Sequence, residues 1–334
     1  MPEETKSSAI YRPDLGQAVM EFVEEASVLG YIGLQVMPIF PTPLASSSYP
    51  VIPKEMLLKV PNVDRAPRSA YPRGDWKYER GFFATSERGF EEPVDDVERA
   101  LLDQEAPGTA DLVATQRAMN HIMRAQEIRI AGTLFNSTNF TAHNLSTEWS
   151  SASTAVPIND VNDAKLAFVA QCGMAPDALI ISYKVFLNLI VCSQIVDRIK
   201  YTFPMIDMNN ISSAQMAQCL GVPRVLIGGA IYDSAAKGVA ASITDIWDDE
   251  YAALVKIGAG LDLTRPCVGR TFLWTADSPQ NAVVEQYREE SLRSDIFRVR
   301  HNVSEELIAS RNTSGTIVSN ISAACMYLMA NVTA

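Results

Sequence analysis

A helical repeat of apolar positions dominates the middle of the chain, in Thr109–Leu134. The segment contains no proline, and its first glycine is Gly132. Residues expected to be buried recur at steps of three and four, as on one helix face: Leu112, Thr115, Met119, Ile122, Met123, Gln126 and Ile130. The polar residues expected to face away are Arg117, Asn120, Arg124, Glu127 and Arg129. We predict a helix about 39 Å long, capped by Thr109 or Asp111. It is either a spine that carries separate sheets or an ordinary surface helix of an α/β enzyme.

Prolines and basic residues mark the chain before this helix. Eight prolines between positions 38 and 72 exclude a long helix there and favour an extended conformation. Alternation in residues 76–90 predicts a strand that returns along the segment. The same region is rich in basic residues: Lys59, Arg65, Arg68, Arg73, Lys77, Arg80 and Arg88. An extended segment of this length most often lies on a partner. A surface loop without fixed structure is the alternative.

Two shorter helices are predicted beside these parts. Residues 14–30 show one apolar helical face between Asp14 as N-cap and Gly30 as stop. Residues 91–105 form a first helical piece, which Pro107 and Gly108 separate from the long helix.

Helices and buried strands alternate from residue 159 onward. The predicted elements are a helix at 159–172, a strand at 178–182, helices at 183–200 and 212–221, and a strand at 223–232. Asn159 or Asp160 caps the first helix, and Gly173 ends it. Ser212 or Ser213 caps the last helix, and Gly221 ends it. This order predicts a small α/β domain with a mixed sheet. Beyond it the pattern predicts strands at 269–275, 282–289, 295–301 and 316–320.

Composition narrows the class of protein. The chain has 334 residues, is 47% hydrophobic and carries a net charge of -11. Such a charge argues against tight binding of nucleic acid through its phosphates, although a container for nucleic acid would tolerate it. We see no secretion signal and no apolar run long enough for a membrane span, so we expect cytoplasmic folding. The five cysteines are predicted to be reduced core thiols: Cys172, Cys192, Cys219, Cys267 and Cys325.

A search for reactive groups finds no convergent site. None of the three histidines, His121, His143 and His301, has a second ligand at metal-binding spacing. Gly228 and Gly229 follow a strand but lack a nucleotide-binding motif. The acids around Trp247 are interpreted as a solvated loop rather than a cation site: Asp245, Asp248, Asp249 and Glu250. We therefore predict no catalytic, cofactor-binding or metal site.

Three segments resemble known proteins. They are PDALIIS at 176–182, LGVPRVLIGGAIY at 220–232 and FRVRHNVSEELI at 297–308. Together with the order of the predicted parts, they resemble the major capsid proteins of tailed bacteriophages, whose fold was first seen in phage Hong Kong 97. Those chains often join a helix ending in Leu-Gly-Val to a strand of the type Val-Leu-Ile-Gly-x-Ala-x-Tyr.

The resemblance implies the α+β Hong Kong 97-type capsid fold, with an extended E-loop hairpin, a peripheral (P) domain and an α/β axial (A) domain. The implied parts are an N-terminal arm at 1–41, the E-loop at 42–92, the spine helix and P-domain at 93–157, the A-domain at 158–268 and P-domain return strands at 269–310. Residues 311–334 would supply a C-terminal strand that joins the A-domain sheet. We place this strand at 316–320.

The resemblance also implies a function and partners. The chain would assemble with itself, as hexamers and pentamers, into an icosahedral shell around double-stranded DNA, which it would not bind sequence-specifically. Scaffolding, portal and decoration proteins would be its partners, and the virion its location after assembly in the host cytoplasm. An encapsulin-like nanocompartment shell and an α/β enzyme with an unrecognised site are the alternatives.

The E-loop supplies the predicted contact between copies. Its basic residues are expected to meet acids of a neighbouring copy, because a basic loop on an acidic body gives complementary surfaces. The basic residues are Arg65, Arg68, Arg73, Lys77 and Arg80, and the acidic ones Glu91, Glu92, Asp95 and Asp96.

Overall fold

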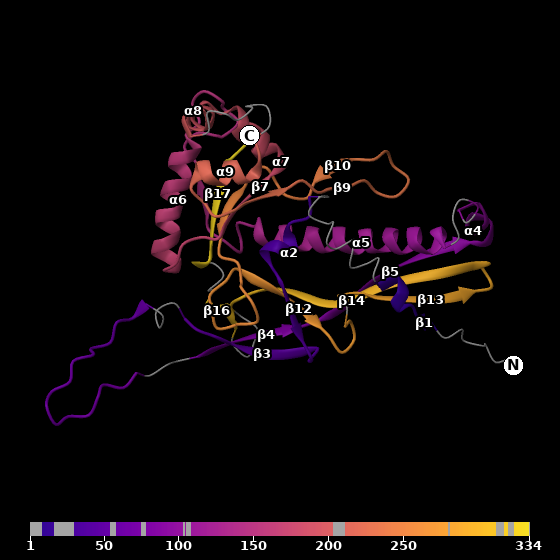
Figure 1. Cartoon of the computed structure of the whole chain (residues 1–334), viewed down its shortest axis with the longest axis horizontal. Helices are drawn as coiled ribbons and strands as arrows, with labels where there is room; N and C mark the ends of the chain where they lie inside the picture. The colour runs from indigo at the N-terminus through magenta and orange to yellow at the C-terminus, as the bar shows by residue number, and fades with distance from the viewer. Residues whose placement is uncertain are drawn as a thin grey trace.

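The structure is a computed structural model, and it describes residues 9–16, 30–53, 58–74, 78–102, 104, 108–202, 211–279, 281–311, 317–319 and 324–333. Most of the helix predicted at 14–30 lies outside the described residues. The chain is α+β, as predicted. A long helix lies along one sheet, a second sheet with its own helices stands at one end of that helix, and an extended arm projects away from both (Figure 1).

The predicted spine helix is confirmed as α5, Thr109–Leu134. It starts after Gly108, whose φ of 86° places it in the left-handed region, so neither predicted cap is the N-cap. The predicted buried face is largely confirmed: six of its seven residues are buried, and alanines such as Ala114 and Ala118 pack against the sheet beside them. Two residues differ from the prediction, because Leu112 lies at the surface and Glu127 is buried.

The helix α5 covers a six-stranded sheet in the order β1-β13-β14-β12-β2, with β5 paired to β14. Phe297 and Val299 of β14 pack against Met119 and Ile122 of the helix. The strands are β1 (Ile10–Tyr11), β2 (Ile39–Thr42), β5 (Ser86–Asp95), β12 (Gly269–Trp274), β13 (Val283–Glu289) and β14 (Ser294–Leu307). The helix predicted from residue 91 begins only at α4, Asp96–Leu102, because 86–95 are paired along β14.

The second sheet has the order β6-β17-β11-β7-β8. Its strands are β6 (Ala142–Asn144), β7 (Ala178–Ser182), β8 (Val225–Gly228), β11 (Ala252–Val255) and β17 (Met326–Ala330). Leu179 and Ile181 face a core with α6 (Pro157–Cys172), α7 (Tyr183–Val191), α8 (Ser193–Thr202) and α9 (Ser213–Leu220). Ile180 faces the other way, onto Ile130 and Leu134 of α5. The C-terminal end of the spine helix thus covers the face of the second sheet opposite to α6–α9.

Several predicted boundaries in this unit are confirmed. The strand β7 has the predicted bounds, Ser212 caps α9 in a capping box with Gln215, and Gly173 and Gly221 end their helices in left-handed conformations. Each of these signals is local, because it rests on residues within a few positions of one another.

Other boundaries differ from the prediction. Proline at N1 starts α6 at Pro157, with Val156 as the N-cap. The helix predicted at 183–200 is two helices, because Cys192 is extended. The strand predicted at 223–232 breaks after β8, and β9 (Ile231–Asp233) pairs instead with β10 (Ile243–Asp245). The strand predicted at 316–320 is β16 (Ile317–Ser319). It pairs with β15 (Ser310–Arg311), and β17 is the strand that enters the second sheet.

Glu127 joins three parts of the fold. Its carboxylate accepts hydrogen bonds from the backbone N–H groups of Ile32 (2.8 Å) and Gly33 (2.9 and 3.0 Å) and from Trp247 Nε1 (2.7 Å). Gly33 begins the short helix α2 (Gly33–Val36), and a Cβ there would lie 2.5 Å from Glu127 Oε2. Burial raises the pKa of Glu127, and these three donors oppose that shift.

Replacing Glu127 with alanine should lower the free energy of unfolding by about 2–4 kcal/mol, because three buried donors lose their acceptor. Glu127→Gln keeps one acceptor oxygen and should lose less than half as much. Chemical denaturation of the two variants beside the parent chain measures both values. Equal losses for alanine and glutamine would contradict this role of the carboxylate.

Candidate assembly surfaces

A two-stranded arm leaves the body beside the first sheet. Strands β3 (Ser46–Val51) and β4 (Glu79–Ala84) pair antiparallel from Ser46 opposite Ala84 to Val51 opposite Glu79. We call residues 46–84 the hairpin arm. Beyond its two strands, residues 59–74 have no helix or strand. They form the end of the arm that lies farthest from the body (Figure 1).

Aromatic stacking anchors the base of the arm. The ring of Phe83 lies parallel to that of Phe272 on β12, with centroids 4.2 Å apart, and Tyr49 stacks on the same ring at 5.4 Å. Gly81 lies opposite Tyr49 in the register, and a Cβ on Gly81 would be 2.3 Å from the Tyr49 ring. The glycine therefore makes room for the tyrosine, and the paired strands share the core of the body as far as Val51.

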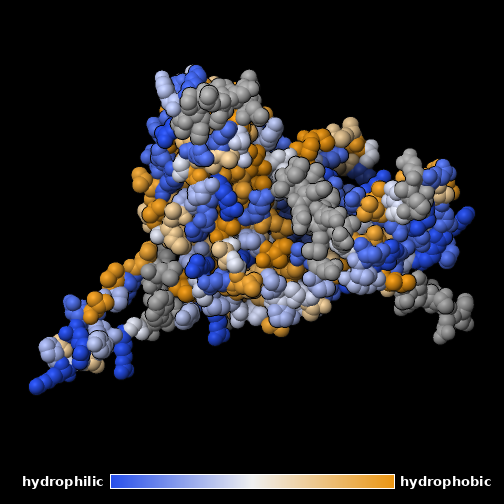
Figure 2. Space-filling model, in the orientation of Figure 1, coloured by the Kyte–Doolittle hydropathy of each residue, from blue (hydrophilic) through white to orange (hydrophobic). Residues whose placement is uncertain are grey.

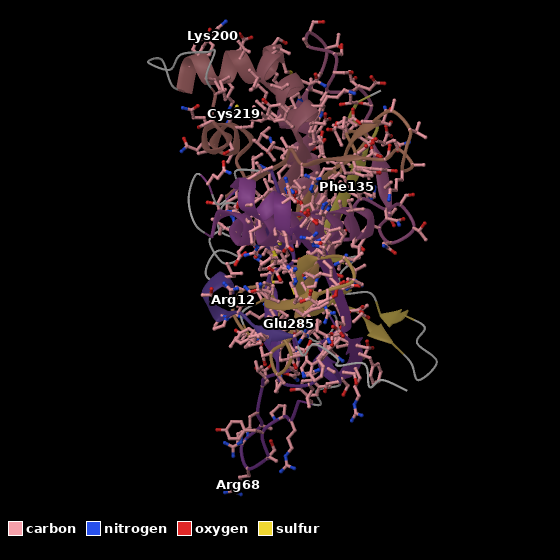
Figure 3. The ribbon with its side chains drawn as sticks, turned by 90° about the vertical axis from the view of Figure 1, so that its right-hand side faces the viewer. Arg12, Arg68, Phe135, Lys200, Cys219 and Glu285 are labelled. Carbon is pink, nitrogen blue, oxygen red and sulfur yellow. The ribbon has the colours of Figure 1, made fainter. Side chains whose placement is uncertain are left out.

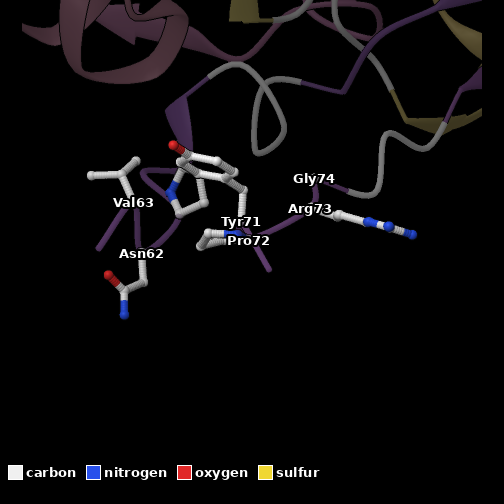
Figure 4. Close-up of a pocket in the computed structure, with 7 residues that line it drawn as sticks. Asn62, Val63, Tyr71, Pro72, Arg73 and Gly74 are labelled. Carbon is white, nitrogen blue, oxygen red and sulfur yellow. The ribbon is translucent and has the colours of Figure 1, made fainter. Parts of the chain in front are cut away.

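The far end of the arm exposes apolar and basic side chains together. Val60, Val63 and Tyr71 are between 71% and 89% exposed. The Arg65 guanidinium lies 4.6 Å from the centre of the Tyr71 ring, and its Nε donates to the Ser69 carbonyl. Pro61, Val63, Tyr71, Pro72 and Arg73 line an open hollow of about 220 Å³ between the two sides of the arm (Figure 4). The far end of the arm therefore offers a binding partner both apolar contacts and positive charge.

The predicted basic residues all belong to this arm. Arg65, Arg68 and Arg73 lie beyond the strands, and Arg68 is at the extreme end, far from the body (Figure 3). Arg80 lies on β4, and Lys77 lies outside the described residues. None of the four described arginines forms an ion pair with another described residue.

The predicted acidic residues lie along β5 and at the start of α4, and most already have partners. Glu91 pairs with Arg298 (2.6 Å), Glu92 with Arg117 (3.5 Å) and Asp96 with Arg288 (2.6 Å). Asp95 accepts a hydrogen bond from the backbone N–H of Val97. The far end of the arm, which carries Arg65, Arg68 and Arg73, points away from these acids (Figure 1), so a contact between these three arginines and the acids requires two copies of the chain.

Ion pairs cover the solvent side of β13 and β14. Glu285 bridges Arg298 and Arg300, and Arg300 also pairs with Asp277 at 2.7 Å. Hydrogen bonding to Asp96 raises the pKa of Arg288, and the same contact lowers the pKa of Asp96. This face is thus polar but nearly neutralised, which contrasts with the unpaired arginines of the arm. Figure 2 shows the mixture of polar and apolar residues on one side of the molecule.

His301 is a buried titratable residue whose role the sequence did not reveal. It lies on β14 and is 3% exposed. Burial and the nearby Arg129 and Arg88 lower the pKa of His301 to about 4, although Glu305 opposes them. Arg129 Nη2 donates to Glu305 Oε1 at 2.7 Å, so the positive charge beside the imidazole is held in place.

The remaining predictions about sites concern thiols, metals and membranes. All five cysteines are buried and unpaired, as predicted. In the part of the chain that the structure describes, no group of three or more histidine, cysteine, aspartate or glutamate residues is arranged to hold a metal ion. Asp249 pairs with Lys184, and with Asp245 and Asp248 it lines an open hollow of about 420 Å³. No described helix is both long and apolar enough to cross a membrane.

Comparison with known proteins gives no match by sequence: no family model matches, and no curated protein matches. Solved structures do match over nearly the whole chain. A phage-related protein from Bordetella bronchiseptica RB50 aligns with a TM-score of 0.70 at 19% identity, over 97% of this chain and 98% of that one. The putative capsid protein of a prophage in E. coli CFT073 aligns with a TM-score of 0.51 at 10% identity, over 97% and 99%. The chain has the Hong Kong 97-type capsid fold.

A structure of a virus-like particle also matches over nearly the whole chain. A virus-like particle protein from Pyrococcus furiosus aligns with a TM-score of 0.52 at 12% identity, over 95% of this chain and 98% of that one. Because this coverage leaves out little of the chain, both sheets and the spine helix belong to the Hong Kong 97-type fold.

Replacing Gly81 with alanine should reduce the free energy of unfolding by about 1–3 kcal/mol, because the new methyl group displaces Tyr49 from Phe272. Gly132→Ala is the matched control. A Cβ at Gly132 meets no atom within 4 Å, so this helical glycine should tolerate alanine or gain up to about 1 kcal/mol. Thermal and urea unfolding compare the two. A Gly81→Ala protein as stable as the parent would contradict the packing argument.

Acid should destabilise the chain through His301. The folded pKa of about 4 lies below the ordinary value of 6.5, so the unfolded chain takes up the proton first as the pH falls. This contribution to stability is present above pH 6.5 and is lost between pH 6.5 and pH 4, by about 3 kcal/mol in total. His301→Gln should flatten the profile of unfolding free energy against pH in that window. An unchanged slope would show that His301 does not titrate as stated.

Proposed function

We propose that this chain is the major capsid protein of a tailed bacteriophage and that many copies assemble into the icosahedral shell around its double-stranded DNA. The observation that carries the proposal is the hairpin arm within a Hong Kong 97-type fold. The arm presents apolar side chains and unpaired arginines far from the body of its own chain. Such a surface is suited to a neighbouring copy.

The physical argument concerns how such an arm can be stable. An isolated two-stranded hairpin is marginal in water, and among the described residues of this one Tyr49, Val51, Ile52 and Phe83 are the buried hydrophobic ones. The far end therefore gains its burial from another chain. A contact between the arm of one copy and a different surface of the next is heterologous, and repetition of such a contact closes into rings. Rings of this kind are the units from which a shell is built.

Charge supports the same arrangement. Residues 58–74 contain four basic residues and one acidic residue, within a chain whose net charge is -11. The arm of one copy is thus attracted to the body of another, and this attraction favours the correct register. We propose that Arg65, Arg68, Arg73, Lys77 and Arg80 meet the acidic strip formed by Glu91, Glu92, Asp95 and Asp96 of a neighbour.

We further propose the roles of the parts. Residues 42–92 serve as the E-loop and 1–41 as the N-terminal arm. Residues 93–157 and 269–310 form the P-domain, and 158–268 with the C-terminal strand form the A-domain around the symmetry axes. Scaffolding, portal and decoration proteins would complete the virion, with assembly in the host cytoplasm. The acidic shell would enclose DNA without gripping it.

Charge reversal in the arm tests the proposal. The double variant Arg65→Glu, Arg68→Glu should abolish assembly, because two attractive contacts per interface become repulsive. The monomer should stay folded, since neither arginine touches the core. The control, Arg65→Lys with Arg68→Lys, keeps the charge and should still assemble. Sedimentation velocity and negative-stain microscopy detect shells, and circular dichroism checks folding, with the neighbouring genes co-expressed for all three chains.

Closed shells of the reversed variant would refute the role of the arm arginines. A parent chain that stays monomeric with all neighbouring genes present would refute the capsid function itself. Nucleic acid extracted from purified shells gives the contents, and shells that hold only protein cargo would contradict the enclosure of a genome.

A further inference from the structure

Two of the five buried cysteines lie side by side although they are far apart in the sequence. Cys172 is the last residue of α6, and Cys325 directly precedes β17. Their sulfur atoms are 3.6 Å apart, in contact without being bonded. Both side chains are at most 5% exposed. No comparable contact between two sulfur atoms occurs elsewhere in the described residues.

The contact makes the two thiols chemically different. When the Cys325 thiol donates its hydrogen to the Cys172 sulfur, the pKa of Cys172 falls and that of Cys325 rises. Lys256 lies near enough to favour the Cys172 thiolate further. Cys172 is also the more exposed of the two, at 5% against 0%. It is therefore the sulfur that an oxidant meets first, and Cys325 is placed to complete the reaction.

We propose that Cys172 and Cys325 are a disulfide-forming site, reduced in the cytoplasm where the chain folds and oxidised by small-molecule disulfides outside the cell. The Cys172 thiolate attacks one sulfur of the oxidant, forms a mixed disulfide and releases one thiolate. Cys325 then loses its proton and attacks the Cys172 sulfur, which releases the second thiolate. The two protein thiols are oxidised, and one molecule of small disulfide is reduced to two thiols.

The bond would fasten the C-terminal strand in place. β17 lies between β6 and β11 in the second sheet and is the last described strand of the chain. The new bond would close a loop spanning the 153 positions between the two cysteines, and long loops gain most from closure. The formation of the bond does not depend on the proposed capsid function, because both cysteines belong to one chain; only its setting outside the cell rests on that function.

Peptide mapping of the purified chain tests the site. After incubation with oxidised glutathione, free thiols are alkylated and the digest is analysed without reduction. We expect a linked pair of peptides that contain Cys172 and Cys325, two hydrogens lighter than their sum. The unfolding temperature should rise on the order of 5–10 °C without reductant and return when reductant is added.

Matched variants separate this site from the other thiols. Cys172→Ser and Cys325→Ser should each abolish the linked peptides and the temperature shift, whereas Cys219→Ser should leave both unchanged. A linkage to Cys267 instead, a glutathione adduct as the only product, or two alkylated thiols after full incubation would each overturn the proposal. The mapping of the parent chain decides the question even if a variant fails to fold.

Discussion

The fold depends on one buried carboxylate. Glu127 sits near the end of the spine helix, at the point where the first sheet gives way to the second, and it satisfies donors from Ile32, Gly33 and Trp247. Each donor comes from a different part of the chain than the acceptor, so a single side chain links the spine helix to the segment at Ile32 and to the loop at Trp247. Burying a charge is costly unless it is hydrogen-bonded. The three donors supply that compensation, and Gly33 supplies the space.

The hairpin arm, unlike Glu127, is satisfied only in part by contacts within its own chain. Its base shares the core through stacking on Phe272, but its far end has no core of its own. Body and arm therefore differ in what stabilises them: the body is closed by internal contacts, whereas under the proposed function the far end of the arm is completed by another chain. This division suits a subunit that must fold alone and then join others. The charges of the first sheet are largely satisfied by ion pairs within the chain, whereas the four described arginines of the arm form no ion pair with another described residue.

Sequence patterns predicted the parts that depend on near neighbours. The spine helix, β7 and the N-cap at Ser212 follow from residues a few positions apart, and the structure has them where expected. The patterns failed where distant contacts decide. Glu127 looked like a solvent-facing residue until Trp247 and the chain at Ile32 were seen to surround it, and the strand that completes the second sheet is β17 rather than the one predicted at 316–320. No local signal marks either feature.

The candidate contact shows the same limit. The sequence predicted which arginines stand on the arm, because prolines and basic residues are visible in it. It could not show that Glu91, Glu92 and Asp96 already pair with arginines of their own chain. An arginine from a neighbour must therefore share those carboxylates, and shared surface pairs contribute little. Asp95 differs, because it lies on the same strip and makes no ion pair within the described residues. Of the four acids, it has the most to gain from an incoming guanidinium.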